Sequence, residues 1–365
     1  MNIIRRLEVS LEEIPEEFRL SSYDYFLPEG FIAQVPAPKR TDSRLLVLNR
    51  KDGTIRHFRF INLVDFLDPS DILVVNDTKV IPARLFAKRH TGGKVEVFTV
   101  RIEDKTIKAM YRTRGRLREG EVLNIIDRAG RRTDIVGRVA SIASDGLISL
   151  ELSVAPKEVL SSHGHVPLPP YIRRKDQSFH ENDAERYQTV FARKEGSVAA
   201  PTAGLHFDYD LLNRIKEKGV KVIPVTLHVG PGTFKPVKTE DIRLHKVLPE
   251  YYYVSESSAN EINLALREKR RVVAVGTTVV RTLEHIAMAN DGCIVSGEGL
   301  ATLTIVPGHT FKVVNAMVTN FHIPKSSLII LVCAFASRSH VLKAYEEAKN
   351  LSYRFYSYGD AMLIL

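Results

Sequence analysis

Two patterns of apolar and polar residues divide this sequence. Between residues 83 and 152, short apolar runs are separated by turn residues such as Gly92-Gly93 and Asp145-Gly146, and no helical period intervenes. The runs cover residues 83–87, 94–100, 106–112, 122–126, 135–140 and 147–152. Short runs closed by tight turns are typical of antiparallel strands. We therefore expect a small antiparallel β-barrel, inserted into the rest of the fold at residues 77–152.

The rest of the sequence alternates between strand-like and helix-like segments. The expected strands cover residues 44–48, 54–60, 72–75, 221–227, 271–275, 301–306 and 311–318. The expected helices cover residues 157–163, 208–218, 257–269, 277–288 and 326–336. Such alternation predicts an α/β fold in which helices pack on a mixed sheet. We assign residues 1–76 and 153–365 to one discontinuous α/β domain that carries the chemistry.

The composition is that of an ordinary globular protein. Of 365 residues, 44% are hydrophobic and 26% are charged. The longest apolar run, residues 328–336, is too short to cross a bilayer, and no hydrophobic segment follows Arg5 and Arg6. The two cysteines, Cys293 and Cys333, argue against a disulfide framework or a cysteine metal site. We expect a cytoplasmic monomer that does not bind membranes.

The net charge of +9 is concentrated in the predicted barrel. Residues 78–152 contain sixteen Lys and Arg against nine Asp and Glu, while the remaining residues carry a net charge of only +2. Within this segment Arg112, Arg114, Arg116 and Arg118 alternate, so an extended backbone would place them on one face, at a spacing that can follow phosphates. Such a face favours contact with the backbone of a nucleic acid. Basic residues also protect a solvated barrel edge from pairing, which is the alternative.

Residues 196–207, Gly-Ser-Val-Ala-Ala-Pro-Thr-Ala-Gly-Leu-His-Phe, contain no charged side chain. A solvated loop would be polar, and Pro201 together with Gly204 opposes a regular helix. We interpret the stretch as a closely packed turn where the backbone approaches a ligand, with Thr202 and His206 as the side chains able to do chemistry. The alternative is a buried connector whose histidine is only hydrogen-bonded.

A buried apolar strand runs directly into Gly276-Thr277-Thr278, where a helix begins. The first N–H groups of a helix are unpaired, and ligands collect at this edge of an open α/β sheet. Thr277 and Thr278 would then hold a carboxylate or a ribose; the alternative is that they only cap the helix. Arg281 and Glu284 are three residues apart and would face each other on the helix surface.

Three histidines, His206, His228 and His322, stand at predicted strand or loop ends. His228 precedes a glycine-rich loop at residues 230–234, a placement that favours function. The three could form a metal triad, but no two lie on one helical turn, and neutral imidazoles suited to proton transfer fit equally well. The sequence has no dinucleotide-binding or P-loop glycine motif and no nucleophile elbow.

Several stretches occur together in the order found in a known family. They are residues 165–172 (HVPLPPYI), 185–191 (ERYQTVF), 196–207, 226–230 (TLHVG), 276–278 (GTT), 318–324 (VTNFHIP) and 353–362 (YRFYSYGDAM). In such blocks, from about Ser21 to the C-terminus, the chain closely resembles the S-adenosylmethionine:tRNA ribosyltransferase-isomerase family of queuosine synthesis.

The resemblance implies an enzyme and its substrates. The family moves the ribose-derived part of S-adenosylmethionine onto a 7-aminomethyl-7-deazaguanine base at the wobble position of a tRNA, which gives epoxyqueuosine and releases adenine and methionine. A base must remove a proton beside the sulfonium, an acid must assist the departure of adenine, and the attacking amine must lose a proton. The expected partners are this tRNA and S-adenosylmethionine as co-substrate, without a prosthetic group or a metal.

The resemblance also suggests roles for individual residues. Groups that titrate near neutrality suit the proton transfers, so His206, His228 and His322 are the expected acid and base residues. Glu185 and Asp360 are carboxylates that would steer the sulfonium or the aminomethyl group. The residues expected to contact substrate are Thr202, Tyr187, Phe207, Thr277, Thr278, Arg281 and Asn320, with Tyr187 and Phe207 stacking on a base. The residues expected to contact tRNA are Arg112, Arg114, Arg116 and Arg118.

Two positions depart from the family pattern. Leu248 stands where the family usually has a second histidine, and Val279 stands where it has a serine, so no role of either family side chain transfers to this chain. Residues 1–18 form an acidic, weakly helical extension that precedes the resemblance. Two other functions stay open: an RNA-binding protein without activity, and an S-adenosylmethionine-dependent RNA methyltransferase, although the glycine-rich loop expected of the latter is missing.

Overall fold

The chain folds into two compact units. A computed structural model describes residues 13–174, 181–230 and 236–365. Within these limits the first unit contains the chain up to residue 76, residues 202–225 and the chain from 234 onward, and the second contains residues 77–201 and 226–233. Most of the predicted loop 230–234 and most of the N-terminal extension lie outside the described residues.

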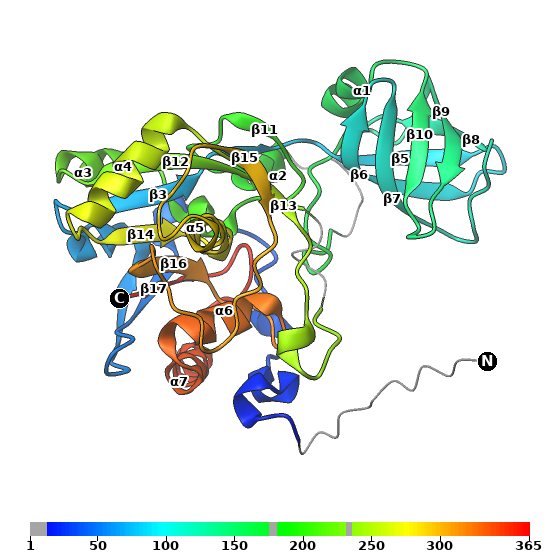
Figure 1. Ribbon diagram of the computed structural model, residues 1–365. Coiled ribbons are helices and arrows are strands. Elements are labelled where there is room, and N and C mark those ends of the chain that lie inside the picture. The colour runs from blue at the N-terminus through cyan, green and yellow to red at the C-terminus, as the bar shows by residue number, and fades with distance from the viewer. Residues whose placement is uncertain (1–12, 175–180, 231–235) are drawn as a thin grey trace, which may run out of the picture. The chain divides into compact units, whose positions relative to one another are not determined.

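A nine-stranded mixed sheet forms the centre of the first unit (Figure 1). Its order is β15 (Gly297–Ala301), β13 (Glu250–Val254), β12 (Lys221–His228), β3 (Ile72–Asn76), β14 (Val272–Val275), β16 (Ala316–Asn320), β17 (Ala361–Ile364), β1 (Arg44–Leu48) and β2 (Ile55–Arg59). The strands β12, β3, β14 and β16 are parallel, whereas β17 is antiparallel to β16. Strands β3, β14 and β16 are buried at every position, as expected of continuous apolar runs inside a helix-covered sheet.

Five helices lie around this sheet (Figure 1). They are α3 (Tyr209–Glu217), α4 (Glu256–Arg267), α5 (Thr277–Ala289), α6 (Ser327–Ala336) and α7 (Arg338–Asn350). The caps predicted for α3 are confirmed: Asp208 accepts the N–H of Leu211 at 2.8 Å, and Gly219 follows the helix with a φ of 100°. In the described part of the chain no single helix is both long and apolar enough to cross a membrane, but α6 and α7, bent by 114°, pass that test as a pair.

Short 3-10 helices complete the first unit. They are η2 (Glu16–Phe18), η3 (Leu20–Tyr23), η4 (Glu29–Phe31), η5 (Arg40–Asp42), η6 (Phe60–Phe66), η7 (Thr202–His206) and η9 (Ile242–Leu244). The uncharged stretch 196–207 is therefore a strand end followed by one 3-10 turn, and the chain passes from the second unit to the first between Pro201 and Thr202.

Two predicted strands lie elsewhere than expected. The run 301–306 is outside any strand except for its first residue, which ends β15. The first half of the run 311–318 is also not a strand, and the ladder begins only at Ala316. Here the buried Glu284 carboxylate accepts three successive backbone N–H groups at 2.8–3.0 Å, those of Lys312, Val313 and Val314. Those N–H groups therefore cannot pair with a neighbouring strand. The apolar pattern of the run does not show that a distant carboxylate will take them.

A closed antiparallel barrel is the main part of the second unit (Figure 1). Its order is β10 (Ile148–Leu152), β7 (Thr106–Thr113), β6 (Lys94–Glu103), β5 (Arg84–Arg89), β8 (Val122–Ile126) and β9 (Arg132–Ile142). Burial alternates along the strands, so Leu85 and Ala87 of β5 fill the interior while Phe86 and Lys88 face outward. The predicted fold class, an α/β sheet with an inserted antiparallel barrel, is confirmed.

The second unit is larger than the barrel alone. It also contains β4 (Thr78–Val80), which pairs in parallel with β11 (Lys194–Ser197), and the helices α1 (Pro156–His163) and α2 (Glu181–Arg186). The compact unit thus continues past the boundary predicted at residue 152. The reason is that α1 packs against β5, and the backbone of His165 pairs with that of Arg84 at 2.7 and 3.1 Å.

Candidate active site

Predicted site residues of the first unit gather at one edge of its sheet. The carboxyl ends of the parallel strands β3, β14 and β16 meet at this edge, and β17 begins there, with Ala361 opposite Asn320. The 3-10 helix η7 covers the edge, since it packs against β16, and a Cβ on Gly276 would lie 3.8 Å from that of Ala203. The fold therefore brings η7, Asn320 and the start of α5 together, at the end of an open α/β sheet where ligands bind.

His206 ends η7 and is 4% exposed. Its Nδ1 lies 2.7 Å from Oγ of Ser43, and its Nε2 lies 3.2 Å from Nδ2 of Asn320. The Ser43 hydroxyl donates to the carbonyl of Arg40, so it accepts from Nδ1–H, and Nε2 is left to accept from Asn320. The ring also stacks on Phe60, with centroids 5.0 Å apart. Both ring nitrogens are engaged, which makes His206 a residue that orients its neighbours in this conformation.

Two of the three predicted acid–base histidines titrate far from neutrality. Burial lowers the pKa of His206 to about 3, and Arg354 and Arg40 act in the same direction. Burial also lowers the pKa of His322 to about 3. The Nε2 of His322 lies 2.7 Å from the Thr319 hydroxyl. Both rings are neutral at pH 7, unlike the near-neutral groups that the sequence led us to expect.

Asn320 presents an unsatisfied carbonyl oxygen at the sheet edge. Its amide nitrogen donates to His206 and, at 3.0 Å, to the carbonyl of Tyr356, so both amide hydrogens are used and the side-chain orientation is fixed. Its Oδ1 is buried, and it has no hydrogen-bond partner among residues 13–174, 181–230 and 236–365. A buried unpaired carbonyl costs about 1–3 kcal/mol. Asn320 is 2% exposed, and Oδ1 is the atom that it can offer to a ligand.

The start of α5 lies beside η7 at the same edge. Gly276 is the N-cap residue with a φ of 99°, a conformation that favours glycine, and no described side chain caps the helix. The first N–H groups of α5 can therefore serve an anionic ligand. Thr277 is buried and Thr278 is partly exposed. Val279 is fully buried, so the family serine has no counterpart here that could reach a ligand.

Arg281 does not pair with Glu284, which corrects the expectation from helical spacing. Its guanidinium forms an ion pair with Glu250 of β13, and the two side chains are only 11% and 7% exposed. Glu284 instead binds the backbone of residues 312–314, as described above. A contact between Arg281 and a substrate carboxylate would have to compete with the buried Glu250.

The Asp360 carboxylate is also engaged within the protein. It is 3% exposed, and it accepts hydrogen bonds from the backbone N–H of Arg44 and Arg354, each at 2.8 Å, and from the Arg44 guanidinium at 3.1 Å. These contacts join the start of β17 to the start of β1. The predicted steering of a sulfonium by Asp360 stays a prediction.

In the second unit, His228 ends β12 beside Gly196. The Nδ1 of His228 lies 2.8 Å from the Thr78 hydroxyl, and Asp77 accepts a hydrogen bond from Thr226 at 2.7 Å. Any Cβ on Gly196 would lie 2.5 Å from Nε2 of His228, so only glycine fits at this approach. Burial lowers the pKa of His228, and Asp77 opposes that effect. Its ring is partly exposed, so it is the accessible histidine of the predicted three.

The predicted aromatic and carboxylate contacts differ in exposure. Tyr187 and Phe207 are fully buried, and Phe207 packs edge-on against Phe60 with centroids 5.0 Å apart. Stacking on a base needs an accessible ring face, so both residues belong to the core in this conformation. Glu185, on α2 of the second unit, is exposed, and Thr202 at the start of η7 is partly exposed. His228, Glu185 and Tyr187 belong to the second unit.

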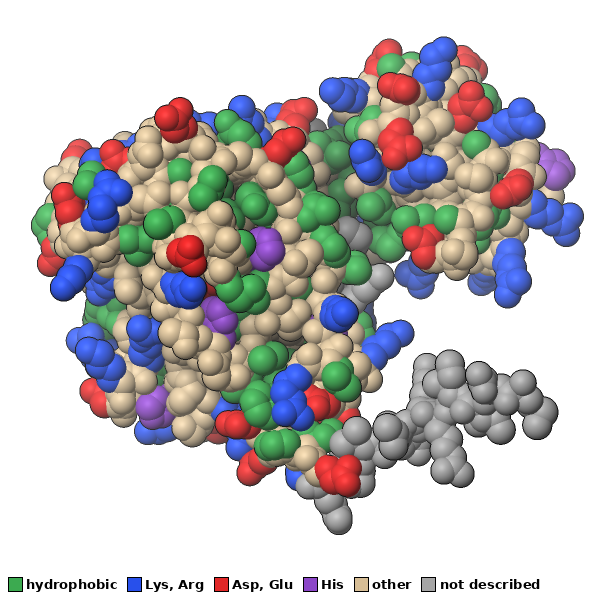
Figure 2. Space-filling model, in the orientation of Figure 1, with side chains coloured by type: hydrophobic (Ala, Val, Ile, Leu, Met, Phe, Trp, Pro, Cys, Tyr) green, Lys and Arg blue, Asp and Glu red, His purple; other side chains and the backbone are tan. Residues whose placement is uncertain are grey.

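The predicted tRNA-contacting arginines are all exposed on the barrel. Arg112 lies on β7, but Arg114, Arg116 and Arg118 lie on the connection to β8, because Gly115 turns the chain with a φ of 79°. They do not continue one extended strand as their alternation suggests. Figure 2 shows Lys and Arg side chains at many places on the visible barrel surface, mixed with fewer acidic ones.

Two residues of this site carry no signal in the sequence. Ser43 and Phe60 hold the His206 ring, yet each lies more than a hundred positions away in the chain. A lone serine or phenylalanine beside a strand is too common to be singled out. No three His, Cys, Asp or Glu side chains in the described ranges are placed to hold a metal ion.

Comparisons with known proteins show which family the chain belongs to. A family model described as "Queuosine biosynthesis protein" matches residues 20–364. An S-adenosylmethionine:tRNA ribosyltransferase-isomerase from Carboxydothermus hydrogenoformans is 47% identical over 352 residues, covering 95% of this chain and 100% of the relative. The enzyme of the same description from Aquifex aeolicus is 46% identical over 349 residues, covering 95% and 100%.

A solved structure is also similar. The crystal structure of an S-adenosylmethionine tRNA ribosyltransferase from Thermotoga maritima is 34% identical, covers 94% of this chain and 100% of its own, and aligns with a TM-score of 0.53. Both the sheet-edge residues and the barrel fall inside the matched region, since the family match runs from residue 20 to residue 364. The chain therefore belongs to the queuosine biosynthesis protein family.

Proposed function

We propose that this chain is an enzyme that transfers and isomerises the ribosyl part of S-adenosylmethionine onto 7-aminomethyl-7-deazaguanine in the anticodon of a tRNA. The observation that carries the proposal is the family match over residues 20–364, together with relatives of this activity that are matched over their full length. Adenine and methionine leave, and the product is epoxyqueuosine. S-adenosylmethionine is a co-substrate, and the reaction as proposed uses no prosthetic group or metal.

The sheet edge of the first unit is the proposed S-adenosylmethionine site. The uncapped start of α5, with the hydroxyls of Thr277 and Thr278, suits the methionine carboxylate or the ribose, because both seek hydrogen-bond donors and a partial positive charge. The buried Oδ1 of Asn320 accepts a hydrogen bond from a ribose hydroxyl or an amino group, and His206 holds that amide in place. Thr202 adds a hydroxyl at the entrance to η7.

The proton transfers are assigned mainly to His228. Its ring is partly exposed, and a lowered pKa keeps it neutral at physiological pH, so that it can accept a proton. Glu185, which is exposed, is the proposed carboxylate that steers the sulfonium or the aminomethyl group. His206 is assigned a positioning role, because both of its nitrogens are already bonded. His322 is assigned a structural role because its ring is buried and bonded to Thr319, and Asp360 because its carboxylate accepts hydrogen bonds from Arg44 and Arg354.

The barrel is the proposed tRNA-contacting part. Arg112, Arg114, Arg116 and Arg118 are exposed and cationic, and contacts from such side chains to phosphates position an RNA without reading its sequence. The protein is proposed to act as a monomer.

The test is to incubate the full chain with S-adenosylmethionine and a tRNA that carries 7-aminomethyl-7-deazaguanine. We expect free adenine in a one-to-one ratio with modified tRNA, and no adenine with a tRNA that carries guanine at that position. Release of S-adenosylhomocysteine would show a methyltransferase instead. Tight tRNA binding with neither product would show an RNA-binding protein without activity.

A further inference from the structure

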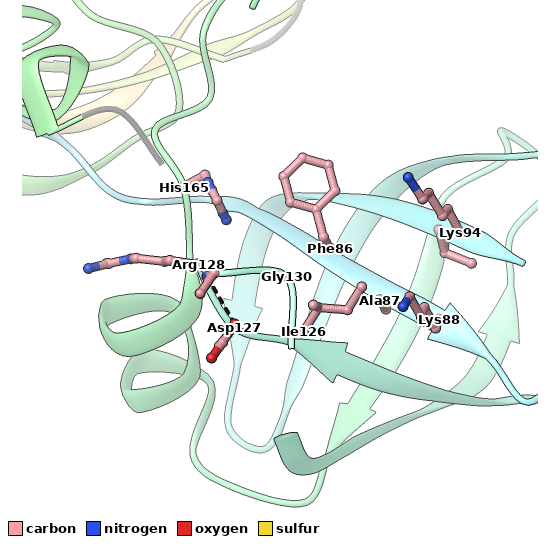
Figure 3. A pocket seen from close by; sticks show the side chains of 11 residues that line it. Phe86, Ala87, Lys88, Lys94, Ile126, Asp127, Arg128, Gly130 and His165 are labelled. Atoms are coloured by element: carbon pink, nitrogen blue, oxygen red, sulfur yellow. Dashed lines mark hydrogen bonds between the residues drawn. The ribbon is translucent and has the colours of Figure 1, made fainter. Parts of the chain in front are cut away.

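A cavity of about 340 Å³ opens on the outer face of the barrel (Figure 3). One wall is formed by β5 and the start of β6, and the facing wall is the turn of residues 126–130, which follows β8. His165 closes one end, and it lies next to Phe86 in Figure 3, while Lys88 and Lys94 lie at the other end. None of these residues belongs to the proposed S-adenosylmethionine site, and all of them lie in the second unit.

The cavity exists because β5 changes its partner along its length. The strand β8 pairs with β5 only from Ala87 to Arg89, whereas at Arg84 the ladder position is taken by His165. Arg128 fixes the facing turn: its guanidinium donates to the carbonyls of Ser161 and Gly164, at 2.6 and 2.9 Å, at the end of α1. The pairing of β5 and the fixed position of the facing turn therefore keep the cavity open.

Two lysines stand directly opposite each other at one end of the cavity. Lys88 and Lys94 are paired in the register of β5 and β6, and side chains paired in this way have Cβ atoms about 4.5–5.5 Å apart. Like charges directly opposite in a sheet are destabilising. Neither ammonium forms an ion pair with another described residue, because Glu96, on the same face of β6, is paired with Arg84. An anionic group bound between them would remove this repulsion.

The side chains that line the cavity carry a net positive charge. Lys88, Lys94 and Arg128 line it against a single carboxylate, that of Asp127. Asp127 is already committed, since it accepts hydrogen bonds from the Arg131 guanidinium at 2.9 Å and from the backbone of Ala129 and Arg131 at 2.9 and 2.8 Å. The cavity is therefore cationic around its rim.

An aromatic ring lies two positions along the strand from Lys88, on the same face. Phe86 lines the cavity, with Arg84 over its ring at 4.8 Å from the centroid and His165 edge-on at 5.0 Å. Burial, with Arg84 and Arg128, lowers the pKa of His165 to about 4, so the His165 ring itself carries no charge at pH 7. An aromatic ring next to a pair of lysines matches one nucleotide, with its base beside the ring and its phosphate at the lysines.

We propose that this cavity binds one unpaired nucleotide of the tRNA substrate, with the base against Phe86 and the phosphate between Lys88 and Lys94. The inference rests on the proposed function, because it takes tRNA as the substrate. It adds a docking contact near the arginine set Arg112, Arg114, Arg116 and Arg118, since Arg112 is paired in register with Glu96, and Glu96 with Phe86. Unpaired RNA nucleotides are the ones whose bases are free to stack on protein aromatic rings.

The first test compares two double variants of the full chain for affinity to the precursor tRNA at several salt concentrations. Lys88→Ala with Lys94→Ala should weaken binding about tenfold and should flatten the salt dependence by about one unit of slope, since one phosphate contact is lost. The matched control, Arg101→Ala with Lys105→Ala, removes the same charge at the far end of β6, where both side chains are exposed. It should change affinity and slope much less.

The second test separates stacking from charge. Phe86→Leu should weaken tRNA binding several-fold with an unchanged salt slope, and Phe86→Tyr should restore it, because only the tyrosine keeps a ring. Thermal unfolding of each variant is measured alongside, and a variant is compared only if its transition matches that of the parent chain.

Three outcomes would overturn the proposal. If the lysine double variant and its control lost the same affinity for tRNA, the effect would come from the net charge of the barrel and not from this cavity. Loss of S-adenosylmethionine binding in the lysine pair, measured by calorimetry, would assign the cavity to the co-substrate. If Phe86→Leu bound tRNA as tightly as the parent chain, no base would stack on Phe86. Adenine release by the parent chain is measured in the same preparations, so a failure of the proposed function is seen separately from a failure of this site.

Discussion

At the sheet edge of the first unit His206 and Asn320 are buried, neutral and bonded to each other, whereas on the outer face of the barrel the lysines and arginines are exposed and cationic. His206 and Asn320 are 4% and 2% exposed and share a hydrogen bond, while Lys94 and Arg112 are exposed to solvent. The first arrangement holds atoms in fixed positions, which suits chemistry on a small molecule. The second exerts a long-range field that salt screens, which suits the capture of a polyanion.

This contrast can be tested, because the two regions should respond to different changes. Substitutions at the sheet edge should alter turnover and leave the salt dependence of tRNA binding as it is. Substitutions on the barrel should do the reverse.

The largest effect is expected for Asn320→Ala. The substitution removes the oriented Oδ1 at the sheet edge, and small losses of positioning cost about 100-fold in rate. Single-turnover release of adenine at saturating S-adenosylmethionine measures it. Asn315→Ala is the matched control, since Asn315 binds the N–H of Val272 at 2.8 Å at the opposite end of β16. Equal rates in the two variants would place the chemistry away from this edge.

The next effect is a loss of stability in acid. His206 and His322 have folded pKa values of about 3 against an ordinary 6.5, so the unfolded chain binds more protons below pH 6.5. The stability that each contributes is fully present above pH 6.5 and is lost as the pH falls towards 3. Between pH 6.5 and 5 each histidine should lower the free energy of unfolding by about 2 kcal/mol.

Urea unfolding of the parent chain and of His206→Gln at pH 7, 6 and 5 measures this loss. The variant should lose stability with a shallower slope, by about 1.4 kcal/mol per pH unit, because one titrating group is gone. An identical slope in both chains would mean that His206 is not buried as the fold describes.

The smallest effect is expected on the barrel. Replacing Arg112, Arg114, Arg116 and Arg118 with alanine should weaken tRNA binding about tenfold near physiological salt and flatten its salt slope, since each lost phosphate contact removes about 0.7–0.9 of a unit. Filter binding at several salt concentrations measures both. The control removes four exposed cations elsewhere on the barrel: Arg101, Lys105, Arg132 and Arg138. If adenine release at saturating tRNA also fell, the division of labour between the two regions would be wrong.

Several local features could be predicted from the sequence because their causes are local. Helix α3 begins after Asp208 and ends before Gly219, as expected, since capping and a left-handed glycine act within one turn. The alternation of apolar residues in 83–152 places Leu85 and Ala87 inside a barrel, as a period of two requires. Resemblance added the family, which the comparisons bear out.

Other features depend on partners that lie far away in the chain. Arg281 chooses Glu250 over the nearby Glu284, and Glu284 takes the backbone donors that would otherwise have extended β16. A helical spacing or an apolar run shows only which contacts a segment could form. Which of these contacts form depends on the competing groups that the fold brings close to the segment.

By itself, then, the sequence determined the strands of the barrel, the strands β1, β2, β3, β12 and β14 of the sheet, the ends of five helices and the short list of polar residues at strand ends. Only the tertiary structure decided what those residues do: His206 became a neutral support between Ser43 and Asn320, and Phe86 came to line a cavity with Lys88 and Lys94. The physical reason is that protonation and hydrogen bonding depend on burial and on partners, and both arise from contacts between segments that are distant in sequence.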